Sequence, residues 1–222
     1  MIERLVPATV ACADTFVDVP DSLMWPAEAA LVAGAVEKRR REFGTVRHCA
    51  RQALAKLGVP PVAVLPGEKR EPQWPPNIVG SMTHCAGYRG ASVAHRIDAL
   101  TLGIDAEPHG ALPNGVLETI ALPRELHLLA ALAAADPGTC WDRLLFCAKE
   151  STYKAWFPLA RRWLGFEDAS VDLHRDGTFT VSLRVPGPLV AGSELRGFAG
   201  QWLVHDGLML TSICLPAEPP PG

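Results

Sequence analysis

The sequence contains no long hydrophobic run. Its longest uninterrupted apolar stretches, such as "ALVAGAV" at residues 30–36, are far shorter than the roughly 18 residues that a membrane-spanning helix needs. The amino-terminal stretch "MIERLVPATVACADTF" has an early glutamate, and its apolar run is broken by Pro7 and Thr9, so it matches a signal peptide poorly. We therefore expect no association with a membrane and a cytoplasmic location.

Cysteine motifs are missing as well, although the chain has six cysteines. No two of them form a C-x-x-C pair, so neither a zinc knuckle nor a compact disulfide framework is indicated. Free thiols in a reducing compartment fit this pattern best. The cysteines are Cys12, Cys49, Cys85, Cys140, Cys147 and Cys214.

Neither sign of charge dominates the chain, whose formal net charge is −3. Such a balance argues against a protein that binds nucleic acid over its whole surface. Residues 37–56, "EKRRREFGTVRHCARQALAK", nevertheless hold seven Lys and Arg against two Glu. A local basic surface on an acidic protein predicts a polyanionic ligand that is bound at one place.

Apolar spacing predicts helices over residues 26–57, with a joint at Gly44 and an end at Gly58. A third helix is expected over "LPRELHLLAALAAA", and a fourth from Trp141 to Trp156. The buried face of this last helix is predicted to hold residues 141, 144, 145, 148, 152, 155 and 156.

Strands are predicted at "RGASVAH" and "ALTLGIDAE", which are close enough to form a hairpin. Asp-Gly pairs between β-rich runs at 176–177 and 206–207 predict two further hairpins. Helices and hairpins segregate, so the predicted class is α+β with antiparallel sheets. We expect an amino-terminal half over residues 1–102, a carboxy-terminal half over 103–216 and a disordered tail over 217–222.

The segment "GIDAEPH" places Asp105 and Glu107 at alternate positions of a predicted strand. Side chains at i and i+2 share one face of a strand, so each carboxylate makes the other harder to ionise. A pair of this kind is stabilised by a cation, although a lone D-x-E more often points into water at a strand end. Repulsion alone predicts that removing Asp105 leaves the fold equally stable or slightly more stable.

The segment "WDRLLFCAKESTYKAW" places Glu150 and Lys154 four residues apart, away from the predicted buried face. Taken alone, this is an ordinary surface pair that contributes about 0.2–0.5 kcal/mol. Together with Asp105, Glu107 and the basic helix, it describes a different site. Hard carboxylate oxygens suit Mg²⁺, which is often completed by water and by substrate phosphates, so the combination indicates phosphoryl transfer.

Four segments in this order resemble the 4′-phosphopantetheinyl transferases of the surfactin-synthetase-activating type. They are "RRREFGTVRHCARQALAKLG", "GSMTHCAGYRGA", "GIDAEPH" and "WDRLLFCAKESTYKAWFPL". The segments "AEPHGALPNGVL" and "RRWLGFEDA" are most similar to the actinobacterial members of the family.

This resemblance implies a Mg²⁺-dependent enzyme that transfers the phosphopantetheine arm of coenzyme A to a serine of an acyl or peptidyl carrier protein. Adenosine 3′,5′-bisphosphate is the other product. The implied fold has two similar α+β halves, each with helices packed on a small antiparallel sheet and with the active site in the cleft between them. A monomer that binds neither nucleic acid nor membrane is expected.

The resemblance also implies roles for individual residues. Asp105, Glu107 and Glu150 bind Mg²⁺, and Glu150 is the candidate base, either directly or through a metal-bound water. Lys154 neutralises or protonates the departing phosphate. The implied coenzyme A contacts are Arg39, Arg47, Lys69, Thr83, His84, Lys149 and Lys154.

One position departs from the family pattern. The family commonly has a lysine or arginine before the proline that precedes its "W-P" turn, whereas here Glu71 precedes Pro72. The nearest cations are Lys69 and Arg70, so their contact with a phosphate is open.

Two other functions fit parts of the pattern. A Mg²⁺-dependent nuclease also uses clustered carboxylates with a lysine, but it needs a broader basic surface. A non-catalytic module that binds nucleotides or carrier proteins would have lost its site, whereas the carboxylates and Lys154 are all present.

Overall fold

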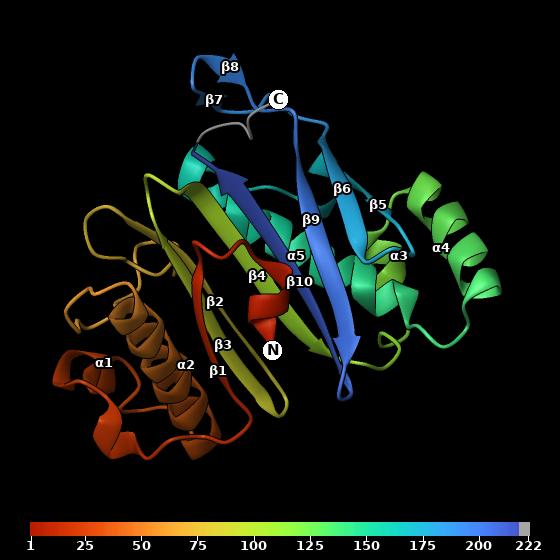
Figure 1. Ribbon diagram of the computed structural model, residues 1–222. Coiled ribbons are helices and arrows are strands. Elements are labelled where there is room, and N and C mark those ends of the chain that lie inside the picture. The colour runs from red at the N-terminus through yellow and green to blue at the C-terminus, as the bar shows by residue number, and fades with distance from the viewer. Residues whose placement is uncertain (218–222) are drawn as a thin grey trace. The chain divides into compact units, whose positions relative to one another are not determined.

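The computed structural model describes residues 1–217, and these form two compact units (Figure 1). The first unit contains Met1–Leu102 together with Pro216 and Ala217, and the second contains Gly103–Leu215. Apart from Ala217, the predicted disordered tail lies outside the described residues. Within them, no helix is both long and apolar enough to traverse a bilayer.

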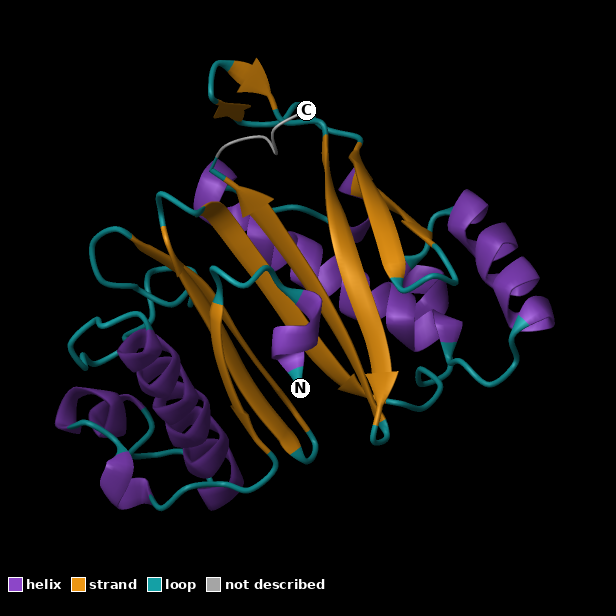
Figure 2. Ribbon diagram, in the orientation of Figure 1, coloured by secondary structure: helices purple, strands orange, loops and turns teal. Residues whose placement is uncertain are grey.

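The first unit is a three-stranded antiparallel sheet with the strand order β1-β3-β2 and a long helix, α2, packed against it (Figure 2). Buried residues of α2 such as Cys49, Ala50 and Leu54 meet Ala91 and Val93 of the sheet. The elements are η1 (Ile2–Leu5), β1 (Ala11–Thr15), η2 (Asp21–Leu23), α1 (Pro26–Leu31), α2 (Glu37–Lys56), β2 (Ile78–Cys85) and β3 (Tyr88–His95).

The second unit is built on a five-stranded sheet with the order β4-β10-β9-β6-β5. Helix α5 packs on this sheet and supplies Trp141, Leu144, Leu145 and Trp156 to the largest buried cluster. The elements are β4 (Ala99–Pro108), α3 (Val116–Ile120), α4 (Pro123–Ala135), α5 (Trp141–Ala160), η3 (Phe166–Asp168), β5 (Ala169–Leu173), β6 (Thr178–Leu183), β7 (Leu189–Val190), β8 (Ser193–Glu194), β9 (Gly197–His205) and β10 (Leu208–Pro216).

The α+β class with antiparallel sheets is confirmed, as are both Asp-Gly hairpins. Strands β5 and β6 pair around Asp176-Gly177, and β9 and β10 pair around Asp206-Gly207. At the second turn both central residues have positive φ, 48° for Asp206 and 73° for Gly207. Asp-Gly favours this backbone, which matches the twist of the flanking strands. The predicted buried face of α5 is also confirmed.

The predicted helix joint at Gly44 is wrong, because α2 runs through this residue without a break. The interruption lies at residues 32–36, between α1 and α2. Gly44 serves packing instead of flexibility: a Cβ atom there would lie 2.7 Å from the Cγ atom of Met24. The predicted end of the helix at Gly58 is confirmed, since α2 stops at Lys56 and Gly58 has a φ of 71°.

The predicted hairpin between β3 and β4 is also wrong, because these strands belong to different sheets. Strand β3 lies between β1 and β2, two strands that the sequence pattern did not reveal. Its hairpin partner is β2, through a two-residue turn at Ala86-Gly87 in which Gly87 has a φ of 79°. A glycine in that turn relieves the steric cost of positive φ, so the shorter connection forms the hairpin.

Candidate active site

The carboxyl-terminal part of β4 carries Asp105 and Glu107. Asp105 is buried and Glu107 is half-buried, so neither points freely into water. Helix α5 passes close to this strand at Gly103, where a Cβ atom would lie 2.0 Å from the main-chain oxygen of Ser151. The glycine therefore permits the close approach of the middle of α5 to the strand that carries the two carboxylates.

Lys154 of α5 connects the helix to β4. Its Nζ atom lies 2.7 Å from Oδ1 of Asp105 and donates to the carbonyl oxygen of Ile104 at 3.0 Å. An ordinary surface lysine has no such partners. Lys154 is therefore not simply one half of a solvated ion pair on the helix surface. Burial lowers the pKa of the ammonium group. The charge and hydrogen bond of Asp105, together with the charge of Glu150, have a larger and opposite effect, so the net shift of the pKa is upward.

Glu107 is held by Arg143, a residue of α5 that sequence reasoning missed. Arg143 Nη1 lies 2.9 Å from Glu107 Oε2, and the same guanidinium donates to the carbonyl oxygens of Gly110 and Ala111 at 3.0 and 2.7 Å. A signal was available, because Arg143 precedes Glu150 by seven residues and therefore lies near the same face of α5. Burial and the charge of Asp105 raise the pKa of Glu107, while Arg143 opposes the shift.

Glu150 lies one turn before Lys154 and is half-buried. Burial raises the pKa of its carboxyl group, and the negative charges of Asp105 and Glu107 add to the rise, while Lys154 opposes it. The three carboxylates therefore act on one another electrostatically, and the repulsion between Asp105 and Glu107 agrees with their positions on one strand. Within residues 1–217, however, no three Asp, Glu, His or Cys side chains gather closely enough to hold a metal ion by themselves.

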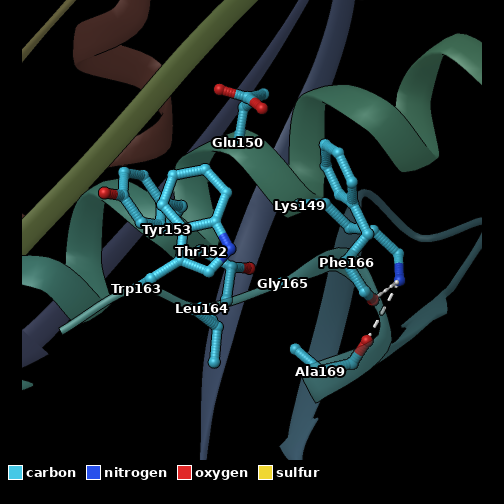
Figure 3. A pocket seen from close by; sticks show the side chains of 9 residues that line it. All are labelled: Lys149, Glu150, Thr152, Tyr153, Trp163, Leu164, Gly165, Phe166 and Ala169. Carbon is cyan, nitrogen blue, oxygen red and sulfur yellow. Dashed lines mark hydrogen bonds between the residues drawn. The ribbon is translucent and has the colours of Figure 1, made fainter. Parts of the chain in front are cut away.

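A small pocket adjoins Glu150 in the second unit (Figure 3). Its volume is about 120 Å³, and the rings of Tyr153 and Trp163 lie at one side with centroids 5.0 Å apart. Most of its lining is apolar or aromatic. The lining residues are Lys149, Glu150, Thr152, Tyr153, Trp163, Leu164, Gly165, Phe166 and Ala169.

Lys149, a predicted coenzyme A contact, is buried and fully engaged within the second unit. Its Nζ atom lies 3.0 Å from Oε2 of Glu125 and donates to the carbonyl oxygens of Phe166 and Ala169 at 2.7 and 3.0 Å. Only 2% of its side chain is exposed. Three protein oxygens therefore already bind its ammonium group, and the coenzyme A contact of Lys149 stays a prediction.

The predicted phosphate contacts of the first unit form a partly assembled group. Arg39 and His84 are exposed, and Arg39 Nη1 lies 3.0 Å from His84 Nε2. Arg47 is buried: it donates to the carbonyl oxygens of Val64 and Phe43, and burial lowers its pKa to about 10. The charge of Arg39 contributes to that shift, so the two guanidinium groups repel each other.

Thr83 is buried, and Lys69 lies in a turn outside α2 and β2. Thr83 is 2% exposed and precedes His84 in β2, so the two side chains leave opposite faces of the strand. Lys69 is exposed in a tight turn where its main-chain N–H donates to Glu71. Among these residues, the exposed Arg39 and His84 lie within hydrogen-bond distance of each other.

The second unit thus combines three interacting carboxylates and an ammonium group between the first strand and the longest helix of an α+β unit, an arrangement suited to phosphoryl transfer. Comparison with known proteins agrees. Residues 27–94 match the model of the 4′-phosphopantetheinyl transferase N-terminal domain, and residues 101–202 match that of the 4′-phosphopantetheinyl transferase superfamily.

Similar proteins have the same family name. The chain is 53% identical to the 4′-phosphopantetheinyl transferase Svp of Streptomyces mobaraensis, over 98% of this chain and 90% of Svp. It is 50% identical to the transferase PptT of Mycobacterium tuberculosis, over 97% of this chain and 98% of PptT. It is likewise 50% identical to the transferase Npt of Nocardia iowensis, over 96% and 99% of the two chains.

The chain belongs to the 4′-phosphopantetheinyl transferase superfamily. It is an enzyme that transfers the 4′-phosphopantetheine arm of coenzyme A to a carrier protein. The predicted family, its actinobacterial character and the reaction are confirmed, which leaves no place for the nuclease or the non-catalytic module.

Proposed function

We propose that Asp105, Glu107, Glu150 and Lys154 form the catalytic centre of this transferase and that the reaction requires Mg²⁺. The observation that carries this proposal is the ion pair between Lys154 and Asp105, which fixes the helix residue against the strand beside Glu107 and Glu150. Charged groups that depend on one another in this way are typical of functional sites.

The residues present fit Mg²⁺ by their chemistry. Asp105, Glu107 and Glu150 supply hard oxygen ligands, and burial with mutual repulsion raises the pKa of Glu107 and of Glu150. A divalent cation would relieve that repulsion, and Mg²⁺ usually takes one or two protein carboxylates plus water and phosphate oxygens. Mg²⁺ held by these residues would neutralise charge on the pyrophosphate of coenzyme A.

The chain's own residues account for the proton and the leaving group. The carrier serine Oγ forms a bond to the phosphorus that carries the pantetheine arm, and the bond from this phosphorus to the bridging oxygen breaks. The electron pair leaves with adenosine 3′,5′-bisphosphate, and the serine proton goes to the carboxylate of Glu150. Burial raises the pKa of the Glu150 carboxyl group. A general base suits this step better when its pKa lies closer to neutral pH.

Lys154 has the simpler role of a positive charge. Its pKa is raised, so the ammonium group retains its proton and neutralises the departing phosphate without protonating it. The apolar pocket beside Glu150 suits part of the uncharged pantetheine arm, since its lining offers little that would bind a phosphate (Figure 3).

We further infer a cytoplasmic monomer whose partners are acyl or peptidyl carrier proteins. The six cysteines, all within the described residues, form no disulfide, which is consistent with a reducing compartment. Both units belong to one chain, so no second copy is needed to supply them.

Mass spectrometry of an apo carrier protein tests the proposed function directly. Incubation with coenzyme A, Mg²⁺ and the enzyme should add the mass of one phosphopantetheine group to the carrier. Omission of the enzyme, coenzyme A or Mg²⁺ should abolish the gain. A full mass gain in the presence of a metal chelator would contradict the magnesium requirement while leaving the transferase activity intact.

The exposed pair Arg39 and His84 is our candidate contact for the 3′-phosphate of coenzyme A. We expect Arg39→Ala and His84→Ala each to weaken the binding of coenzyme A by about tenfold, because each removes one charge-assisted hydrogen bond. Binding of 3′-dephospho-coenzyme A should change much less, because that ligand lacks the contacted group. Isothermal titration with both ligands measures the difference.

Arg41 provides the matched control for this experiment. It lies on the same helix, is exposed and pairs with Glu37 four residues earlier, as expected for a solvated helix face. Arg41→Ala should leave both affinities within about twofold, since exposed ion pairs contribute little. If Arg39→Ala lowered the affinities for both ligands equally, the arginine would contact a part of coenzyme A other than the 3′-phosphate.

A further inference from the structure

Helices α1 and α4 begin in the same way although they belong to different units. Each has a proline as its first residue and a glutamate as its third, in "WPAE" and "LPRE". Each glutamate turns back to accept the main-chain N–H of the residue before its proline. Glu125 Oε2 accepts from Leu122 at 2.7 Å, and Glu28 Oε2 accepts from Trp25 at 3.2 Å.

In the second unit this glutamate is the centre of a buried ion pair with Lys149. Glu125 is 1% exposed and also accepts the main-chain N–H of Val171 in β5 at 2.7 Å. Lys149 donates in turn to the carbonyl oxygens of Phe166 and Ala169. The pair therefore ties α5 to the start of α4, to η3 and to β5.

In the first unit Glu28 makes the equivalent pair with Arg51 of α2. Glu28 is fully buried, and Arg51 Nη1 lies 2.6 and 2.8 Å from its two carboxylate oxygens. Glu28 Oε1 also accepts the main-chain N–H of Val64 at 2.9 Å, as Glu125 accepts that of Val171. Both units thus fix their longest helix with a glutamate, a cation and a downstream main-chain N–H.

A lysine follows the cation of this pair after five residues in both helices. Lys154 donates to the carbonyl oxygen of Ile104 in β4 at 3.0 Å, and Lys56 donates to that of Cys12 in β1 at 2.5 Å. The ion pair at one point and the lysine at another fix both the rotation of the helix and its height along the strand.

Two of the proposed catalytic carboxylates have no counterpart in the first framework. Gln52 follows Arg51 where Glu150 follows Lys149. Ala13 follows Cys12 where Asp105 follows Ile104. The first unit therefore has the same supporting contacts without these two carboxylates. The contacts themselves do not require the proposed catalytic residues.

We propose that the buried pair of Glu125 and Lys149 is a positioning device for Glu150, which directly follows Lys149. The inference rests on the proposed function of Glu150. A buried charge is costly unless it is paired and fully hydrogen-bonded, so α5 cannot rotate or slide without leaving a charge unpaired. Lys149 directly precedes Glu150, and both line the pocket with Phe166 and Ala169 (Figure 3).

The test replaces the pair with uncharged side chains in Glu125→Gln/Lys149→Met, which avoids a single unpaired charge. We expect kcat to fall by about tenfold, because a small displacement of a catalytic group is costly, while KM for the carrier protein stays within about twofold. Lys149→Arg should retain near-normal kcat, since Arg51 serves the same purpose in the first unit. Assays are run well below the unfolding midpoint of each variant, as measured by circular dichroism.

Glu28→Gln/Arg51→Met is the matched control. It removes the same kind of pair from the unit that lacks the carboxylates, so it should lower the unfolding midpoint and leave kcat within about twofold. An equal loss of kcat in this control and in the test variant would show that the pair supports only the fold. If the test variant fails to fold, Glu125→Asp shortens the pair by one methylene and should show the same selective loss of kcat.

The Glu150→Gln background separates this inference from the proposed function. If the pair acts through Glu150, adding Glu125→Gln/Lys149→Met to Glu150→Gln should lower kcat by less than about twofold more. A further tenfold loss would overturn the positioning role. Normal turnover by Glu150→Gln alone would instead overturn the proposed function, whatever the pair variants do.

Discussion

Glu150→Gln is expected to lower turnover by roughly 10²–10⁴-fold, the usual contribution of a general base. Glutamine keeps the shape of the side chain but can neither accept the serine proton nor offer a charged ligand to Mg²⁺. Coenzyme A affinity should change far less, because the proposed 3′-phosphate contacts, Arg39 and His84, lie on α2 and β2.

The measurement is turnover against pH with a saturating carrier protein. Glu150 must be ionised to accept the serine proton, so wild-type activity should rise with pH as this base ionises. Glu150→Gln should lose this rise. The exposed Glu118 of α3 is the control, because Glu118→Gln should leave both rate and profile unchanged. A Glu150→Gln enzyme within about threefold of wild type at every pH would remove Glu150 from the mechanism.

Local pattern predicted the second unit better than the first. Helices α4 and α5 and the hairpins at Asp176-Gly177 and Asp206-Gly207 follow from helical spacing and turn chemistry, which act over a few residues. The place of β3 between β1 and β2 depends on pairing between residues 11–15 and 89–93, far apart in the chain. Single-sequence pattern contains no signal for such a partner.

The candidate site shows the same division. The sequence indicated Asp105, Glu107, Glu150 and Lys154 because strand and helix periodicity place them on common faces. It assigned Lys149 to coenzyme A and gave no sign of its buried ion pair, since a lysine beside a catalytic motif suggests a phosphate contact until its partner is known. That partner, Glu125, lies 24 residues earlier and its role emerges only when α4 packs on β5 and α5.

Asp105→Ala is expected to abolish Mg²⁺-dependent turnover and also to destabilise the fold. Repulsion between Asp105 and Glu107 alone would predict equal or greater stability without Asp105. The structure reverses the sign, because Asp105 Oδ1 lies 2.7 Å from Lys154 Nζ. Its removal leaves the ammonium group bonded to the Ile104 carbonyl oxygen without this carboxylate. Loss of a half-buried ion-pair partner should cost about 1–3 kcal/mol, less than for a fully buried pair because 28% of the Lys154 side chain is exposed.

Asp105→Asn separates the two effects of this substitution. Asparagine can still accept a hydrogen bond from Lys154, so Asp105→Asn should keep more of the free energy of unfolding than Asp105→Ala does. It lacks the negative charge of the proposed Mg²⁺ ligand, so turnover should fall by at least about 10²-fold, comparable to the loss of a key electrostatic group. Thermal unfolding without Mg²⁺ and turnover against Mg²⁺ concentration, measured on all three proteins, give both quantities. Normal turnover at limiting Mg²⁺ by either variant would contradict the metal assignment, and an Asp105→Ala protein more stable than wild type would show that repulsion outweighs the contact with Lys154.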